Sequence, residues 1–102
     1  MKGTLIIIKV DGSTTKRTYE GRCVPLEDLN RAVGGYLEVV PFFNQFKDNR
    51  CIAFCDEDGR IKNYKINAFA TALWHCQRPD VQDHLVGDIA ILWGDREFME
   101  DL

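Results

Sequence analysis

The chain contains no long apolar run and no excess of positive charge. Its most apolar N-terminal stretch is Leu5–Ile8, whereas a membrane-spanning helix needs about 20 apolar residues and a signal-peptide core about 7–15. Lys and Arg number 13 against 16 Asp and Glu, so the formal net charge is −3. Proteins that bind duplex DNA usually carry the opposite sign, because Lys and Arg neutralise phosphates. We therefore expect a cytoplasmic protein that binds neither membranes nor duplex DNA.

The sequence also contains none of the short motifs that mark common catalytic sites. It has no Gly-x-Gly-x-x-Gly, no Gly-rich phosphate loop with Lys and no Gly-x-Ser-x-Gly elbow. The only adjacent thiol and base are Cys76 and His75, with Asp80 and Asp83 nearby. Neighbours in sequence rarely share the geometry that a nucleophile and its base require. We expect no cofactor, no catalytic residue and no enzyme activity, with a hydrolase or thiol enzyme as the least favoured alternative.

The four cysteines do not have the spacing of a metal site. In a strand, Cys51 and Cys55 stand about 13 Å apart, because each residue advances about 3.3 Å. Sulfurs that share a zinc ion lie within about 4 Å of each other, and a disulfide needs a similar approach. We expect no metal site and small, buried thiols in a reducing compartment.

The pattern of turn residues and apolar residues predicts one α+β domain over residues 1–102. The first half predicts a hairpin of Thr4–Val10 and Thr14–Gly21, a helix Pro25–Gly34 and a strand Tyr36–Val40 buried on both faces. The second half predicts a central strand Arg50–Cys55, a return strand Arg60–Lys65, a helix Asn67–Cys76, a strand Val86–Gly94 and an acidic tail Asp95–Leu102. The sheet is expected to be mostly antiparallel, with about five or six strands packed with one or two helices.

Three phenylalanines crowd the loop after the predicted strand Tyr36–Val40. Phe42, Phe43 and Phe46 stand among Asn, Gln, Lys and Asp residues. The favoured interpretation is that these rings fold over one end of the core. The alternative is an exposed apolar patch that a partner covers, together with Trp74 and His75.

A small-ligand cleft is a second possibility. Stacked aromatic rings and cations hold a base and a phosphate in many nucleotide sites. The candidate residues for such a cleft are Tyr19, Arg22, Lys62, Tyr64 and Arg78.

Four blocks of the sequence resemble the domain family DUF3846. They are Val33-Gly34-Gly35-Tyr36-Leu37-Glu38-Val39-Val40-Pro41, the acidic turn Cys55–Lys62, the segment Asn67–Leu73 with Ala70-Thr71, and Leu85-Val86-Gly87-Asp88-Ile89. The resemblance spans about Leu5 to Gly94. It implies an α+β domain found in bacteria and in many bacteriophages, and it implies no activity.

These observations together predict a non-enzymatic binding protein. We expect a modulator or inhibitor of a host protein, encoded by a phage or mobile element and acting through the Phe42–Phe46 loop, the Trp74–His84 region or the acidic tail. The alternative is a protein that sequesters a small nucleotide-like signalling molecule. A homodimer formed by sheet extension beside the polar hairpin is also open.

Overall fold

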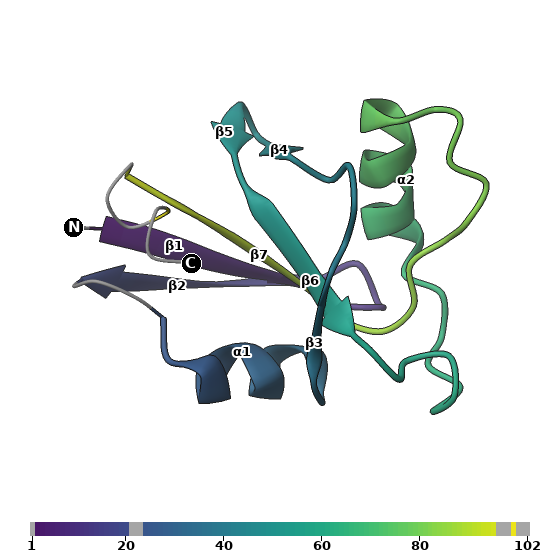
Figure 1. Ribbon diagram of the computed structural model, residues 1–102, viewed down its shortest axis with the longest axis horizontal. Helices are drawn as coiled ribbons and strands as arrows, with labels where there is room; N and C mark the ends of the chain where they lie inside the picture. The colour runs from purple at the N-terminus through teal and green to yellow at the C-terminus, as the bar shows by residue number, and fades with distance from the viewer. Residues whose placement is uncertain (1, 21–23, 96–98, 100–102) are drawn as a thin grey trace.

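The computed structural model describes residues 2–20, 24–95 and 99, and its centre is an antiparallel sheet (Figure 1). The sheet has the order β2-β1-β7-β6-β3, and a short hairpin, β4-β5, forms a second sheet. The strands are β1 Lys2–Ile8, β2 Thr14–Glu20, β3 Leu37–Val39, β4 Gln45–Phe46, β5 Asn49–Arg50, β6 Ile52–Asp56 and β7 Ile89–Gly94. The helices are α1 Leu26–Val33 and α2 Ala68–Gln77. The predicted α+β class is confirmed.

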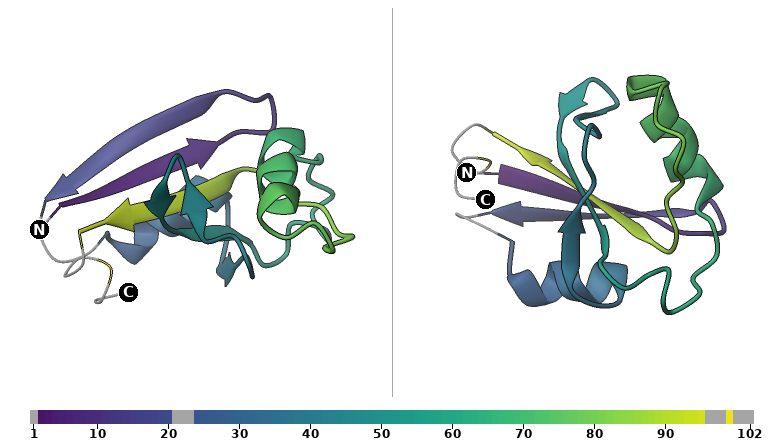
Figure 2. Two further views of the ribbon diagram at one scale, coloured as in Figure 1. Left: turned by 90° about the horizontal axis from the view of Figure 1, so that it is seen from above. Right: turned by 45° about the vertical axis from the view of Figure 1, so that its right-hand side comes forward.

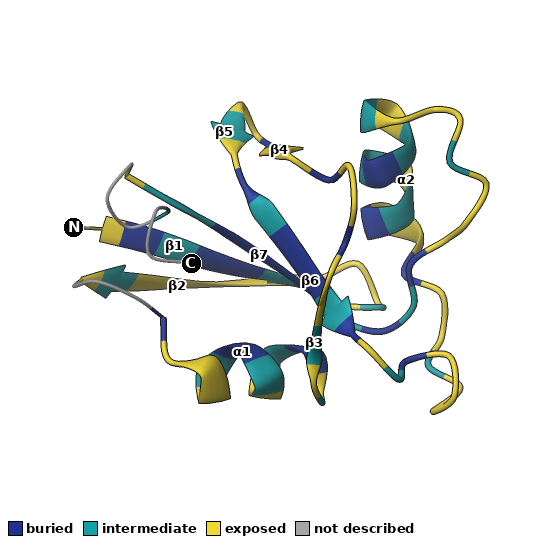
Figure 3. Cartoon of the chain, in the orientation of Figure 1, coloured by how far each residue is buried: buried dark blue, intermediate teal, exposed yellow. Residues whose placement is uncertain are grey.

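Each face of the large sheet carries its own apolar cluster, because side chains alternate along a strand. Leu5, Ala90 and Leu92 face α1, where Leu29 and Val33 cover them. The opposite cluster contains Ile6, Ile8, Ala53, Ile89 and Ile91, together with Phe43, Phe46, Ala70 and Trp74. Thus α1 covers one face, and the β4-β5 hairpin and α2 cover the other (Figure 2). The inner strands are mostly buried, whereas β2 is exposed along most of its length (Figure 3).

The first hairpin and α1 form as predicted. β1 and β2 pair in antiparallel register around a turn at residues 10–12, and the polar strand β2 lies at an edge of the sheet. α1 begins after Pro25 and ends at Gly34, whose φ of 91° lies in the left-handed region. Glycine adopts this φ without the steric cost of a β-carbon, and the Gly34 N–H then bonds the Asn30 carbonyl oxygen at 2.8 Å.

The predicted burial of the strand Tyr36–Val40 is wrong. β3 is the edge strand opposite β2, and Tyr36 and Val39 are 74% and 58% exposed. Only Val40 of this segment is buried. Apolar and β-branched residues favour a strand at the edge of a sheet as well as at its centre. The sequence pattern therefore predicted the strand correctly but not its position in the sheet.

The predicted return strand Arg60–Lys65 is also wrong, because residues 57–63 form successive turns. The buried Asp56 carboxylate directs this path: it accepts a hydrogen bond from the Asp58 N–H at 2.9 Å and one from Lys62 Nζ at 2.7 Å. Asn63 has a φ of 59°, which interrupts an extended strand. β6 is nevertheless central, as predicted, because β7 and β3 flank it.

The C-terminal half otherwise follows the prediction, with a later start for its last strand. α2 extends from Ala68 to Gln77, and β7 begins at Ile89 and pairs with both β1 and β6. Most of the predicted acidic tail lies outside the described residues. In the part of the chain that the structure describes, neither helix is long and apolar enough to cross a membrane.

Candidate functional site

The four described residues of the predicted ligand cleft do not share one cavity. Tyr19 lies under α1, Lys62 and Tyr64 lie beyond the end of α1 near Gly34, and Arg78 follows α2. Arg22 lies outside the described residues. Two of the grooves among the described residues contain charged residues that the sequence analysis did not select.

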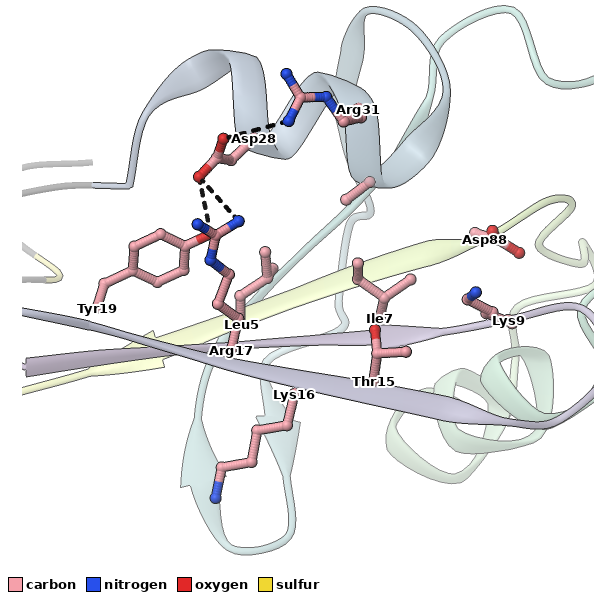
Figure 4. Close-up of a pocket in the computed structure, with 11 residues that line it drawn as sticks. Leu5, Ile7, Lys9, Thr15, Lys16, Arg17, Tyr19, Asp28, Arg31 and Asp88 are labelled. Carbon is pink, nitrogen blue, oxygen red and sulfur yellow. Dashed lines mark hydrogen bonds and ion pairs between the residues drawn. The ribbon is translucent and has the colours of Figure 1, made fainter.

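The first groove lies between α1 and the face of β1 and β2, and has a volume of about 410 Å³. Leu5 and Ile7 form its apolar floor, while Arg17 and Tyr19 reach toward α1 from β2 (Figure 4). Lys16 contributes its main chain only, since its side chain points away from α1. Arg17 and Tyr19 share a face because they are two residues apart on one strand.

Asp28 organises the polar side of this first groove. Its carboxylate accepts a hydrogen bond from the Tyr19 hydroxyl at 3.1 Å, and it lies 3.6 Å from Arg17 Nη1 and 4.0 Å from Arg31 Nη1. Burial, and then the hydrogen bond to Asp28, raise the pKa of Tyr19 above its usual value, so the hydroxyl remains a donor. With Lys9 and Asp88 included, three cations face two carboxylates, which favours a small anion.

The second groove borders β3 on the other face of the sheet and has a volume of about 380 Å³. Val40, Trp74 and Leu85 line it with buried apolar side chains. Glu38 and Glu57 stand exposed at its border. Its other charged groups are already paired, since Arg60 bonds Asp83, and Lys62 bonds Asp56.

The predicted aromatic surface is divided between core and solvent. Phe43 and Phe46 are 1% and 5% exposed, so they close the core as the favoured interpretation predicts. Phe42 is 47% exposed, and the Arg78 guanidinium carbon lies 4.1 Å from the centre of its ring. Trp74 is buried, and its Nε1 donates to the Pro41 carbonyl oxygen at 2.7 Å. Of the three phenylalanines, only Phe42 is open to a partner.

His75 is half-buried, and its imidazole already forms a hydrogen bond. Its Nε2 lies 2.7 Å from the Asp83 carbonyl oxygen and donates to it, because a carbonyl can only accept. Asp80 and Asp83 each bond an arginine, Arg78 and Arg60 respectively. The described residues therefore contain no oriented thiol, base and carboxylate at this helix end.

The pKa values of two cysteine thiols also argue against nucleophilic chemistry. Burial raises the pKa of Cys51 and of Cys55 to about 11, so both remain protonated thiols. Cys51 is buried as predicted, whereas Cys55 is half-buried and Cys76 is exposed. Cys23 lies outside the described residues. Across residues 2–20, 24–95 and 99, no group of three His, Cys, Asp or Glu side chains is placed to hold a metal ion.

Sequence reasoning missed Asp28, Arg31, Glu38 and Glu57. Asp28 and Arg31 had a detectable signal, because residues three apart on a helix share one face. No pattern in the sequence indicated Glu38 and Glu57, because they lie at one groove only when β3 pairs with β6.

A comparison with protein-family models places the chain in a family. Residues 1–101 match the family model described as a domain of unknown function, DUF3846. No curated protein and no solved structure matches the chain. The match covers nearly the whole sequence and confirms the resemblance seen in its motifs, and the chain therefore belongs to the DUF3846 family.

Proposed function

We propose that the protein is a non-enzymatic binding protein, encoded by a phage or mobile element, that modulates a protein in the host cytoplasm. The observation that carries this proposal is the segment 36–42, in which Tyr36, Val39 and Phe42 are all substantially exposed. Single exposed apolar side chains are ordinary, but three within seven residues at one edge of the sheet offer a partner several apolar contacts in one place. Tyrosine and phenylalanine are also common in the buried centres of protein interfaces.

The end of this segment is held in a defined position. Phe42 has a φ of 65°, and its ring lies beside Arg78, whose Nε also bonds Asp80 at 2.7 Å. The main chain on either side is anchored, because Val40 N–H bonds the Ala53 carbonyl oxygen and the Asn44 N–H bonds Gln77 Oε1. A surface ordered before binding loses less conformational entropy when a partner arrives.

Photo-crosslinking in the bacterial host tests this proposal. The full chain would carry a benzophenone amino acid in place of Tyr36 or Phe42, and we expect one saturable, light-dependent adduct with a host protein. Excess wild-type protein should compete with its formation. The matched control carries the same group in place of Thr18, which is exposed on the opposite edge strand. The proposal fails if no saturable adduct forms, or if the Thr18 probe captures the same protein equally well.

A second candidate function is the binding of a small anion, such as a nucleotide-like signalling molecule. The first groove supports it, because an apolar floor of Leu5 and Ile7 lies beside Tyr19, Arg17 and Arg31. The ring and the floor suit a flat apolar group, and the guanidinium groups suit a phosphate.

Native mass spectrometry of protein purified from cells, with thermal-shift titrations against a nucleotide panel, checks this candidate. We expect a bound adduct, and for Arg31→Gln an affinity about tenfold weaker, because hydrogen bonds to charged groups contribute about 1.5–3 kcal/mol. Lys16→Gln is the control, since that side chain points away from the groove (Figure 4). A clean unliganded mass together with no thermal shift across the panel would eliminate this function.

A further inference from the structure

The outer edge of β3 presents main-chain groups that no described strand pairs. The Glu57 N–H bonds the Tyr36 carbonyl oxygen at 2.9 Å, and the Val40 N–H bonds the Ala53 carbonyl oxygen at 2.9 Å. In an antiparallel ladder, alternate residues direct their N–H and C=O groups toward the same neighbour. Tyr36, Glu38 and Val40 therefore face β6, while Leu37 and Val39 direct their N–H and C=O groups away from the sheet. This outward row is a template for one more strand.

The side chains beside this row differ on the two faces of the sheet. Val39 lies opposite Phe54 in the ladder, on the α1 face, and is 58% exposed. Glu38 lies opposite Cys55 on the other face, where it borders the second groove with Glu57. Neither glutamate forms an ion pair with any residue that the structure describes, whereas Asp56 and Asp83 each have a basic partner. The groove therefore has two uncompensated negative charges at its border.

We propose that the outer edge of β3 binds an extended segment of a partner protein, in which basic and apolar residues alternate, as an added β-strand. A strand residue opposite Glu38 projects its side chain toward Glu38 and Glu57, where Lys or Arg is complementary. Residues opposite Leu37 and Val39 project to the other face, where the exposed Val39 favours an apolar side chain. This inference rests on the proposed function, and names the contact surface and the chemistry of the partner.

A second copy of the same edge is a poor occupant. Two β3 strands paired about a two-fold axis through Glu38 would place the two Glu38 carboxylates directly opposite each other. Like charges in that position destabilise a strand pair. Main-chain hydrogen bonds would supply the affinity for a separate segment, and its alternating side chains would supply the specificity.

NMR titration of the 15N-labelled full chain tests the proposal. The probe is the blocked peptide Thr-Lys-Val-Lys-Val-Lys-Thr, and the comparison peptide has Glu in place of each Lys. We expect the Leu37 and Val39 amide signals to shift and these amides to gain protection from hydrogen exchange with the Lys peptide only. Equal shifts with the Glu peptide, or shifts centred on β2, would overturn the inference.

Proline substitutions separate the two edges. Val39→Pro removes an outward N–H without removing a bond to β6, so we expect at least a tenfold loss of affinity for the Lys peptide. The matched control is Thr18→Pro. The Lys9 N–H bonds the Ser13 carbonyl oxygen, so the odd-numbered residues of β2 direct their main-chain groups toward β1. Thr18 therefore directs its N–H outward from β2. An unchanged affinity in Val39→Pro would contradict strand addition.

Two further measurements keep the test independent of that variant's folding. A Lys peptide N-methylated at its central residues should not bind wild-type protein, because its main-chain donors are blocked. Glu38→Gln combined with Glu57→Gln should weaken binding of the unmodified peptide about fivefold and reduce its salt dependence. Binding of the methylated peptide, or an unaltered salt dependence, would overturn the inference. So would light scattering that shows self-association through β3, abolished by Val39→Pro.

The inference and the proposed function can fail separately. A host protein that crosslinks at Tyr36 or Phe42 and is captured equally well by the Val39→Pro chain would overturn strand addition and leave the proposed function standing. Peptide binding at β3 without any saturable adduct in cells would support strand addition and contradict the proposed function.

Discussion

Replacing Asn67 with alanine is expected to lower the free energy of unfolding by about 2–4 kcal/mol. Asn67 is fully buried, and its Nδ2 donates to the Ile8 carbonyl oxygen at 2.8 Å and to the Gly87 carbonyl oxygen at 3.0 Å. Its Oδ1 accepts from the Ala70 N–H at 3.1 Å and so caps α2. One amide thus joins the end of β1, the approach to β7 and the start of α2. Urea denaturation at equilibrium would measure the loss.

Three comparison variants make the Asn67 result specific. Asn67→Ser keeps the helix cap and loses the two donated bonds, so an intermediate loss is expected. Asn67→Asp should be at least as damaging as alanine at neutral pH, because a carboxylate oxygen would face two carbonyl oxygens. Asn44→Ala changes an exposed side chain and should alter stability by less than about 0.5 kcal/mol. A loss in Asn67→Ala no larger than that of Asn44→Ala would contradict this account.

Replacing Asp56 with asparagine is expected to lower the free energy of unfolding by about 1–3 kcal/mol at pH 7. The carboxylate is buried, and it accepts bonds from Lys62 Nζ and from the Asp58 N–H. Lys62 Nζ also donates to the Gly34 carbonyl oxygen at 3.1 Å, which ties the end of α1 to the end of β6. An asparagine keeps the shape but removes the charge that complements Lys62.

The same variant has a defined pH dependence. Burial alone would raise the pKa of Asp56, but hydrogen bonds from Lys62, the Asp58 main chain and Tyr64 outweigh it and leave the pKa below its usual value. A lowered folded-state pKa means that Asp56 contributes stability fully above the unfolded pKa of about 3.9, and that this contribution is lost as the pH falls through the folded pKa. The difference between wild type and Asp56→Asn should therefore shrink below about pH 4.

Urea denaturation across pH 2.5–7 would follow this difference. Asp48→Asn, at an exposed turn, is the matched control and should change the free energy of unfolding by less than about 0.5 kcal/mol at pH 7. A difference between wild type and Asp56→Asn that stays constant from pH 7 to pH 3 would rule out the negative charge of Asp56 as its cause.

The candidate surfaces were only partly accessible to sequence reasoning. Phe42 is exposed, as the alternative of an apolar patch requires. Phe43 and Phe46 have nearly the same neighbours in sequence but are buried. Local composition does not distinguish these rings, because the direction of each depends on how the β4-β5 hairpin packs on the sheet. Tyr19 lines the first groove, whereas Arg78, predicted for the same cleft, lies beside Phe42.

The features that residue types alone predict are local. The helix that ends at Gly34, the helix capped by Asn67 and the hairpin of β1 and β2 follow from glycine at a left-handed φ, an asparagine cap and a turn between β-forming runs. Each of these depends on atoms within a few residues of one another. The residue types alone therefore suffice to predict them.

Which strands lie at the edges of the sheet follows from tertiary packing alone. Both β3, which contains Leu37 and Val39, and the buried strand β7 contain residues that favour a strand. β7 is buried because β1 and β6 flank it, whereas among the described strands β3 pairs with β6 alone. Strand order results from contacts between residues far apart in the chain, and those contacts leave the Leu37 and Val39 main chain open beside Glu38 and Glu57.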